Sequence, residues 1–361
     1  MQFTQPDSCG TPRKLSPLSL ATAGIVSAAI FVTIAPAQAD FLYTGFQNSG
    51  ITRINERTGE VTSVFAKPSD GFVHFRGMAL GPDGLLYVSA AKYTDPGKPG
   101  RWGIHRFNPQ TGDFLGTLIQ DPIDWILFGP NGSLYGVLSW TNDLVEYDRV
   151  TGASKRTVLA DYVGNFVFVD DQHIFAATGF GNHKLARYDL TTGERTGPIT
   201  DLRELGFEDY GFDRMALSPT GELLAPYNYR NRDTVLPGGI MRFDPVTGML
   251  IDTLLDDLPA FGAAAGGQLG LAFDPDGHLY VGSQLAKAVL KFDPLSKAQI
   301  GEYPTGSNGA SATFIQFLPV PEPSATCLVT IGLIGMRLRR RPHRGSYDSI
   351  ACRVHPASLI V

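Results

Sequence analysis

Cysteine is scarce in this chain of 361 residues, which contains Cys9, Cys327 and Cys352 and no others. All three lie near the ends, so residues 40–323 can form no disulfide and offer neither a thiol nucleophile nor a cysteine ligand for a metal. Charged residues are also few, at 18% of the chain, where about a quarter is usual in soluble domains. The long middle segment must therefore be stabilised mainly by buried apolar surface.

The chain also lacks an excess of basic residues. Lys and Arg number 30 against 35 Asp and Glu, which gives a formal net charge of −5 at pH 7. Within residues 40–323 the imbalance is larger, with 22 basic residues, 33 acidic residues and a net charge of −11. Such a surface repels polyanions, so we expect no nucleic-acid partner, and binding of acidic polymers only where Arg or aromatic side chains gather.

Glycine and proline, by contrast, are abundant, with 41 and 25 residues, and aromatic residues make up 11% of the chain. Frequent turn formers and aromatic residues, together with the low charged content, favour an all-β fold over a helical one. The length would accommodate two average domains, although closed β folds often reach this size as a single domain. Internal repeats distinguish between these two organisations.

One seven-residue phrase occurs six times, and residues 242–248 show a regular form, Arg-Phe-Asp-Pro-Val-Thr-Gly. Its Asn or Asp caps a turn, Pro fits the second turn position and Gly supplies a positive φ, so each copy predicts a β-hairpin. The other copies are residues 53–59, 106–112, 146–152, 187–193 and 291–297. A second phrase with a Pro-Asp-Gly type of turn, as at residues 78–88, precedes most copies and predicts another hairpin. Two hairpins make a blade of four antiparallel strands.

The two ends of the repeat region complement each other. Residues 41–45 match the second strand of a unit, whereas residues 315–319 match the first strand. We therefore expect one blade to take its inner strand from the C-terminal side and its other three strands from the N-terminal side, which closes a ring and leaves only short edges. The sequence predicts a six-bladed β-propeller of four-stranded antiparallel blades over residues 40–319. It resembles the NHL, YVTN and streptogramin-lyase-like propellers over residues 41–319.

Residues 1–39 have the organisation of a secretory signal peptide. Arg13 and Lys14 precede an apolar run at 18–34, and Ala37-Gln38-Ala39 is a small-x-small cleavage site. We expect cleavage between Ala39 and Asp40. The alternative is an uncleaved membrane anchor, which Pro36 and the alanine-rich end disfavour.

Residues 320–341 resemble a PEP-CTERM sorting signal. The motif Pro321-Glu322-Pro323 is followed by an apolar stretch at 325–336 and then by four basic residues, Arg337, Arg339, Arg340 and Arg341. The resemblance implies an exosortase-type processing enzyme as a partner, transient membrane association through a short apolar helix, and delivery to the cell surface or extracellular matrix of a Gram-negative-type bacterium, in an exopolysaccharide setting. Residues 342–361 form an extra tail that we expect to be disordered.

The residues just before each inner strand should surround one mouth of the central channel. The long connections between strands gather on this face, which is the usual location of binding residues on a rigid scaffold. The mixed charges there suit a polar ligand or a cation. The alternative is a self-neutralising, water-filled channel in which Arg76 and Arg214 pair with Asp124 and Asp213. The candidate mouth residues are His74, Arg76, Asp124, Asn165, Asp213, Arg214 and Gln268.

Enzymes with similar folds indicate what catalysis would require. Gluconolactonase-like propellers hold a divalent metal with a Glu, two Asn and an Asp; the matching oxygen ligands here are Asp124, Asn165 and Asp213, without a Glu. Streptogramin-lyase-like enzymes need a His pair with a Glu, and His74 is the one histidine expected at this mouth. The sequence therefore predicts no cofactor, leaves Ca²⁺ or another divalent cation open, and makes an enzyme the less favoured interpretation.

Aromatic residues near the long-loop face would either stack on sugars or pack between blades. The sequence thus favours an exported, monomeric, non-enzymatic binding or structural module whose partner is a polysaccharide or another surface protein. The alternative is a metal-dependent lactonase-like hydrolase, or a streptogramin-lyase-like enzyme, working in the central channel. The aromatic residues in question are Trp102, Trp140, Tyr93, Tyr210, Tyr227 and Tyr229.

Overall fold

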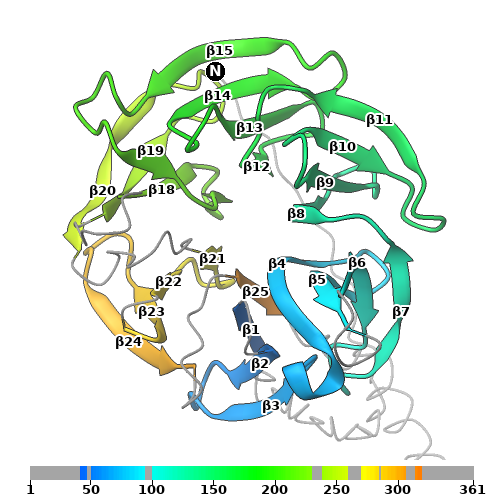
Figure 1. Ribbon diagram of the computed structural model, residues 1–361. Coiled ribbons are helices and arrows are strands. Elements are labelled where there is room, and N and C mark those ends of the chain that lie inside the picture. Colours follow the sequence, from blue (N-terminus) through cyan, green and yellow to red (C-terminus); the bar gives the residue numbers. More distant parts are fainter. Residues whose placement is uncertain are drawn as a thin grey trace, which may run out of the picture. The chain divides into compact units, whose positions relative to one another are not determined.

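The computed structural model describes residues 41–46, 50–93, 100–229, 238–258, 270–283, 286–305 and 314–318, which form six antiparallel sheets around a central axis (Figure 1). The predicted six-bladed, all-β propeller is confirmed. Both terminal segments lie outside the described residues, as does Gln268. No helix within the described ranges has the length and hydrophobicity needed to traverse a bilayer.

The ring closes because blade 1 is shared between the two ends of the repeat region. Its inner strand β25 (Phe314–Leu318) pairs with β1 (Phe41–Phe46), followed outward by β2 (Gly50–Asn55) and β3 (Val61–Phe65). In Figure 1 the orange β25 lies beside the dark blue β1. The two strands are antiparallel, with Phe41 opposite Leu318, which confirms the predicted composite blade.

The other five blades follow in chain order, each running from an inner strand at the axis to an outer strand at the perimeter (Figure 1). A 3-10 turn, η1 (Pro68–Asp70), leads into blade 2. In blade 5 two short segments, β16 and β17, pair in succession with β18 and replace one continuous inner strand. The strands are β4 (Phe72–Leu80), β5 (Leu86–Lys92), β6 (Arg101–Phe107) and β7 (Phe114–Ile119) in blade 2; β8 (Ile123–Phe128), β9 (Leu134–Leu138), β10 (Leu144–Tyr147) and β11 (Ser154–Leu159) in blade 3; β12 (Asn165–Phe168), β13 (His173–Thr178), β14 (Lys184–Asp189) and β15 (Arg195–Asp201) in blade 4; β16 (Tyr210–Phe212), β17 (Ala216–Leu217), β18 (Leu223–Tyr229), β19 (Gly238–Phe243) and β20 (Leu250–Leu258) in blade 5; and β21 (Leu271–Phe273), β22 (Leu279–Ser283), β23 (Ala288–Phe292) and β24 (Gln299–Pro304) in blade 6.

The first repeated phrase forms the predicted turn between the third and fourth strands of each blade. In blade 5, for example, Asp244 Oδ1 accepts hydrogen bonds from the backbone N–H groups of Val246 and Thr247, both at 2.8 Å. Five copies end in a glycine with φ between 71° and 79°, and Lys297 adopts φ 60° in the sixth copy. The turn residues therefore supply the local hydrogen bonds and backbone conformation that close these hairpins.

These turns also pack against the preceding blade, which the sequence did not predict. A Cβ on Gly152 of blade 3 would lie 2.5 Å from the carbonyl oxygen of Leu118, on the outer strand of blade 2. The same relation places Gly193 against Val158, at 2.4 Å. The turn glycine is thus required twice, once for its backbone conformation and once because neighbouring blades approach closely there.

Basic residues at the start of the phrase link one blade to the next. Arg53 Nη1 in blade 1 donates to the carbonyl oxygen of Gln110 in the blade 2 turn, at 2.7 Å. At the closing seam, Lys291 Nζ in blade 6 lies 2.7 Å from Glu56 Oε1 in the blade 1 turn and 3.1 Å from Asp274 Oδ2. The Tyr280 hydroxyl donates to Glu56 at 2.5 Å. Charge-assisted hydrogen bonds therefore hold the first and last blades together.

Candidate functional site

Three inner strands leave regular β pairing at the end that faces the long loops. The register shifts between Val73 and Gly77 in β4, and between Ile123 and Ile126 in β8. In blade 5 the inner strand is interrupted between β16 and β17. Such bulges redirect side chains that would otherwise alternate across the sheet. The interruptions carry most of the predicted mouth residues, namely His74, Arg76, Asp124, Asp213 and Arg214.

An ion pair joins blades 2 and 3 at this end of the axis. Arg76 Nη1 contacts Asp124 Oδ1, as the self-neutralising alternative anticipated, and the Ser139 hydroxyl donates to the same oxygen at 2.7 Å. The side chains of Arg76 and Asp124 are 42% and 30% exposed. The pair is therefore satisfied internally and still accessible to a ligand from solvent.

A ring platform lies beside the ion pair. The Arg76 guanidinium carbon is 4.4 Å from the centroid of the Trp102 ring. The exposed His74 stacks on the same tryptophan, with ring centroids 5.9 Å apart and planes inclined by 26°. We call His74, Arg76, Trp102 and Asp124 the mouth cluster. It combines a partly exposed aromatic surface with one strong donor group and one strong acceptor group.

Arg214 reaches from blade 5 to three other blades. Its guanidinium carbon lies 3.9 Å from the ring centroid of Phe314 in blade 1 and 4.8 Å from that of Trp125 in blade 3. Its Nη2 donates to the carbonyl oxygen of Arg76 in blade 2, at 2.9 Å. Because the side chain is 5% exposed, the two rings and the carbonyl compensate for its lost hydration. Arg214 thus links blade 5 to blades 1, 2 and 3.

Asp213 and Asn165 lie among buried polar groups. The Asn228 side-chain amide donates to Asp213 Oδ2 at 2.5 Å, and both residues are at most 2% exposed. Asn165 Nδ2 donates to the carbonyl oxygen of Phe212 at 3.3 Å, whereas its buried Oδ1 has no hydrogen-bond partner among the described residues. The Asn165 bond joins the inner strands of blades 4 and 5, and the Asn228 bond lies within blade 5.

The donor set fits a divalent cation poorly. Of the three predicted ligands, Asp124 already accepts hydrogen bonds from a guanidinium and a hydroxyl, and Asp213 accepts one from an amide. The guanidinium groups of Arg76 and Arg214 already place positive charge near these predicted ligands, and this charge opposes the binding of a metal cation. Oxygen-rich Ca²⁺ sites instead gather several free carboxylate and carbonyl oxygens.

A different group, Asp274, Asp276 and His278, brings three ligand-type atoms within 4.8 Å of one another among the described residues. It lies on the turn between β21 and β22. Asp274 is already hydrogen-bonded to His278 Nδ1 at 2.9 Å and paired with Lys291. The hydrogen bonds that Asp274 accepts outweigh the effect of its burial and keep its pKa below the ordinary value. These contacts assign the group to the closing seam.

Tyr227, one of the predicted aromatic residues, and His105 both have structural roles. Tyr227 is 2% exposed and packs against Phe207 at a centroid distance of 5.1 Å, so for this ring the packing alternative is confirmed. His105, also 2% exposed, bonds to Thr117 Oγ1 and to the carbonyl oxygen of Ala90. Burial lowers the pKa of His105 to about 4. It is therefore a neutral core residue at pH 7.

Sequence reasoning placed Trp125 with Asp124 just before an inner strand, and it missed Ser139 and Phe314 as parts of this region. Regular strand alternation would put Asp124 and Trp125 on opposite faces, and the bulge in β8 removes that constraint. Nothing in the sequence pointed to Phe314, because its role depends on a contact with Arg214 from another blade.

The comparisons with known proteins support the fold and leave the activity open. No protein-family profile and no curated protein sequence matches the chain. Among solved structures, a chain of a nidogen/laminin complex is similar with a TM-score of 0.57 and 12% identity, covering 78% of this chain and 99% of that one. A Bacteroides caccae protein of unknown function gives a TM-score of 0.54 and 10% identity, with 78% and 100% coverage. A virginiamycin B lyase from Staphylococcus aureus gives a TM-score of 0.42 and 13% identity, with 71% and 73% coverage.

Proposed function

We propose that this protein is exported and acts as a non-enzymatic binding module at the cell surface or in the extracellular matrix. The predicted signal peptide and the PEP-CTERM-like segment with its exosortase-type partner support this location. In this proposal the ligand is an uncharged, hydroxyl-rich molecule, a saccharide, which binds at the mouth cluster. The propeller is the rigid support for that site.

The mouth cluster is the observation that carries the proposal. Trp102 is partly exposed beside His74 and Arg76, and in this proposal the apolar face of a sugar packs against the exposed part of its ring. The partly exposed Arg76 and Asp124 provide a donor and an acceptor for hydroxyl groups, and they are held in place by each other and by Ser139. Because this ion pair has little net charge, a neutral ligand suits it better than an ion.

A binding experiment tests this function. The exported protein is screened on a glycan array and in pull-downs with envelope polymers and proteins, and the affinity of any hit is measured. We expect Trp102→Ala to weaken saccharide binding about tenfold, which corresponds to one lost stacking contact. Val150→Ala removes an exposed apolar side chain from the opposite, tight-turn face and should leave binding unchanged. Absence of binding to any saccharide would count against the proposal.

The second candidate function is a metal-dependent, lactonase-like hydrolase that uses Asp124, Asn165 and Asp213. The buried Oδ1 of Asn165, which accepts no hydrogen bond from the described residues, is the observation in its favour. Metal analysis of the purified protein discriminates between the two functions. A stoichiometric divalent metal that is lost in Asp213→Ala would favour the hydrolase, and the Arg76–Asp124 ion pair leads us to expect the opposite.

A further inference from the structure

Three large aromatic side chains stand exposed on the loop face of blades 3 and 4. Trp140 is 80% exposed, Phe180 is 79% exposed and Tyr162 is 45% exposed. We call these residues the aromatic arc. Large apolar rings that remain in water forgo the main stabilising effect available to them, and clusters of them commonly mark binding surfaces.

Trp140 and Phe180 occupy equivalent places in successive blades. Trp140 is on the β9–β10 loop and Phe180 on the β13–β14 loop, and each stands two residues before an asparagine in a left-handed conformation, with φ 57° at Asn142 and 59° at Asn182. The carbonyl oxygens of these asparagines accept hydrogen bonds from Val163 N at 2.7 Å and from Phe212 N at 2.8 Å. The two loops are therefore fastened at their bases, which reduces the entropy lost when a ligand binds.

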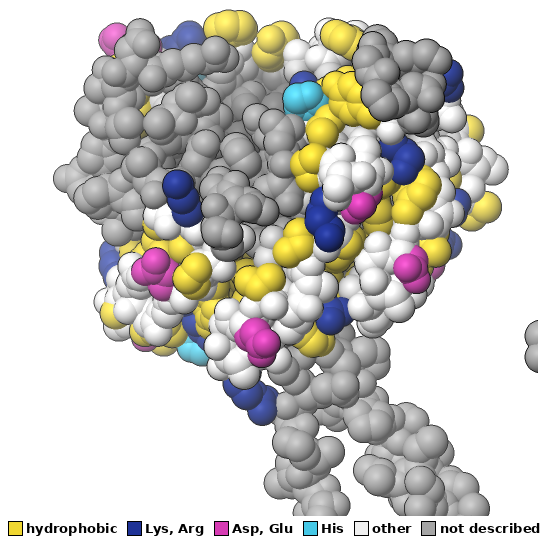
Figure 2. Space-filling view, turned by 60° about the horizontal axis from the view of Figure 1, so that its bottom comes forward, with side chains coloured by type: hydrophobic (Ala, Val, Ile, Leu, Met, Phe, Trp, Pro, Cys, Tyr) yellow, Lys and Arg dark blue, Asp and Glu magenta, His cyan; other side chains and the backbone are white. Residues whose placement is uncertain are grey.

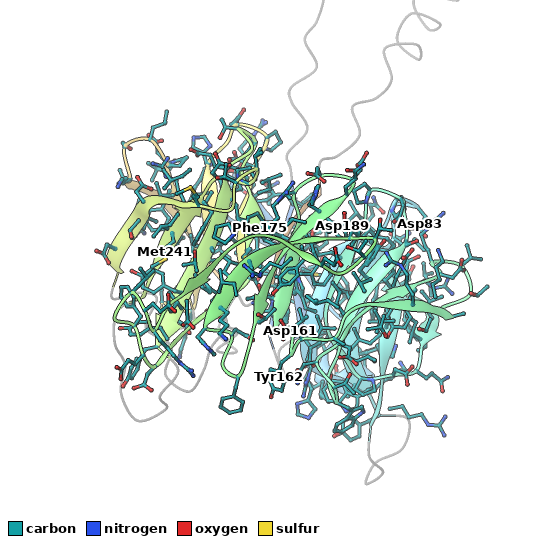
Figure 3. The ribbon with its side chains drawn as sticks, turned by 90° about the horizontal axis from the view of Figure 1, so that it is seen from above. Asp83, Asp161, Tyr162, Phe175, Asp189 and Met241 are labelled. Carbon is teal, nitrogen blue, oxygen red and sulfur yellow. The ribbon has the colours of Figure 1, made fainter. Side chains whose placement is uncertain are left out.

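Tyr162 connects the two loops. Its ring centroid lies 6.1 Å from that of Phe180, with the planes inclined by 45°, and its neighbour Val163 bonds to the loop that carries Trp140. Figure 3 places Tyr162 at one end of the strands and Asp83 and Asp189 at the other, so the arc lies opposite the tight turns. Tyr162 and Val163 thus link the loop of blade 3 that carries Trp140 to the loop of blade 4 that carries Phe180.

The arc also continues from the mouth cluster. Ser139, which donates to Asp124, directly precedes Trp140 in the chain. A path therefore runs from Trp102 and Arg76 through Asp124 and Ser139 to Trp140, and on across the arc. The path carries a ring at Trp102, hydrogen-bonding groups at Asp124 and Ser139, and rings again from Trp140 onward.

The chemistry of the path fits a polysaccharide better than a protein. The exposed rings stand one per loop, between glycine and small polar residues such as Gly179, Gly181 and Thr141, whereas the centre of a protein interface is a continuous, densely packed apolar patch. Figure 2, in which the lower part of Figure 1 comes forward, shows described hydrophobic, uncharged and charged side chains interspersed, with no large patch of one charge among them. Sugar rings joined in a chain present apolar faces at intervals with hydroxyl groups between them, which matches this arrangement.

We propose that the aromatic arc is an extended binding site for a neutral polysaccharide, which continues the saccharide site at the mouth cluster and so rests on the proposed function. The net charge of −11 over residues 40–323 disfavours an acidic polymer. Several weak stacking contacts along one chain reinforce each other, because after the first contact the others form at a high effective concentration. The arc therefore binds long chains better than short fragments.

The test uses the exported protein and a panel of neutral polymers (dextran, laminarin, galactomannan and xylan), acidic alginate, and tetrasaccharide fragments of whichever polymer binds. We expect the double variant Trp140→Ala/Phe180→Ala to lose about tenfold in affinity for the polymer while its affinity for the tetrasaccharide changes less than twofold. Trp102→Ala should weaken both. The control Val150→Ala/Leu295→Ala removes two exposed apolar side chains from the tight-turn face and should change neither.

Each outcome separates the two proposals. If the double variant binds the polymer as well as the native protein does while Trp102→Ala does not, the proposal for the aromatic arc is wrong and the proposed function stands. If the native protein binds the tetrasaccharide and the polymer with equal affinity, the proposal for the aromatic arc is also wrong. If no neutral polymer or fragment binds, both proposals fail. If the double variant keeps polymer binding and loses a surface protein, the arc is a protein interface. Matching thermal unfolding of the variants, with Trp140→Phe expected to retain most of the affinity, excludes misfolding as the cause.

Discussion

Removal of the Lys291 ammonium should weaken the contact between blades 6 and 1, where the propeller closes. Lys291 bridges Glu56 of blade 1 and Asp274 of its own blade, and its side chain is 13% exposed, against 22% and 6% for the two acids. In Lys291→Met the methylene packing is largely kept while the charge is lost. Two carboxylates then remain close together, linked by the Tyr280 hydroxyl, which contacts Glu56 at 2.5 Å and Asp274 at 3.3 Å.

The size of the effect follows from burial. Removal of one partner from a fully buried ion pair costs about 3–5 kcal/mol, and the partial exposure of Glu56 reduces this, so we expect Lys291→Met to lower the free energy of unfolding by about 2–3 kcal/mol. The pair formed by Lys155 and Glu146 is the matched control, because its Nζ–Oε1 distance is 3.7 Å and Lys155 is 43% exposed. Lys155→Met should cost less than about 1 kcal/mol.

Urea unfolding at several pH values measures this prediction. Burial alone would raise the pKa of Glu56 and Asp274, but Lys291 and the hydrogen-bond donors around them hold both pKa values below the ordinary ones. The stability that comes from these carboxylates is present above their unfolded pKa and is lost as the pH falls through the folded values. The difference between native protein and Lys291→Met should therefore shrink below about pH 4.5. Equal stability at pH 7, or a difference that does not change with pH, would refute the reasoning.

Three further predictions concern single positions. Gly152→Ala should cost about 2 kcal/mol more than Gly84→Ala in urea unfolding, because both have a positive φ but a Cβ on Gly152 alone meets a carbonyl oxygen, at 2.5 Å; equal costs would contradict the close approach of blades. Since burial lowers the pKa of His105 to about 4, the unfolded chain binds one more proton between pH 6.5 and 4, and the free energy of unfolding should fall by about 3 kcal/mol on acidification through that window. His105→Gln should show a shallower fall, and an identical pH profile would count against this. Lys297→Gly should raise the stability by about 0.5–1 kcal/mol, since Lys297 alone among the six turn-ending residues adopts φ 60° without being glycine; an unchanged or lower melting temperature would contradict it.

The fold was predictable because its information is local and repeated. The Asn or Asp that opens each turn and the glycine that closes five of the six turns lie within five consecutive residues, so a single sequence displays them. Even the composite blade could be predicted, since the strands near Phe41 and Ile315 carry the same patterns as their counterparts in complete blades. Contacts between blades were not predictable, because they join residues with no fixed spacing, such as Lys291 and Glu56.

The site was predictable in position and only partly in detail. Alignment of the inner strands placed Arg76 and Asp124 together, and the structure contains their ion pair. It also led us to expect Arg214 to act as a partner of Asp213, whereas its side chain lies against Trp125 and Phe314. Asp213 and Arg214 lie in the break between β16 and β17, and strand alternation cannot be extrapolated through such an interruption.

The two faces of the propeller therefore carry different tasks. On the tight-turn face, capped turns and glycines such as Gly152 fix each blade to its neighbour, and substitutions there should act on stability. On the loop face, the bulges give up regular hydrogen bonds of the inner strands, and the Arg214 contacts to three other blades offset that loss. Rigidity at the axis then leaves the periphery of the loop face, where Trp140 and Phe180 stand exposed, free to change with the ligand. Under the proposed function, exchange of these outer rings should alter which saccharide binds while leaving the melting temperature unchanged.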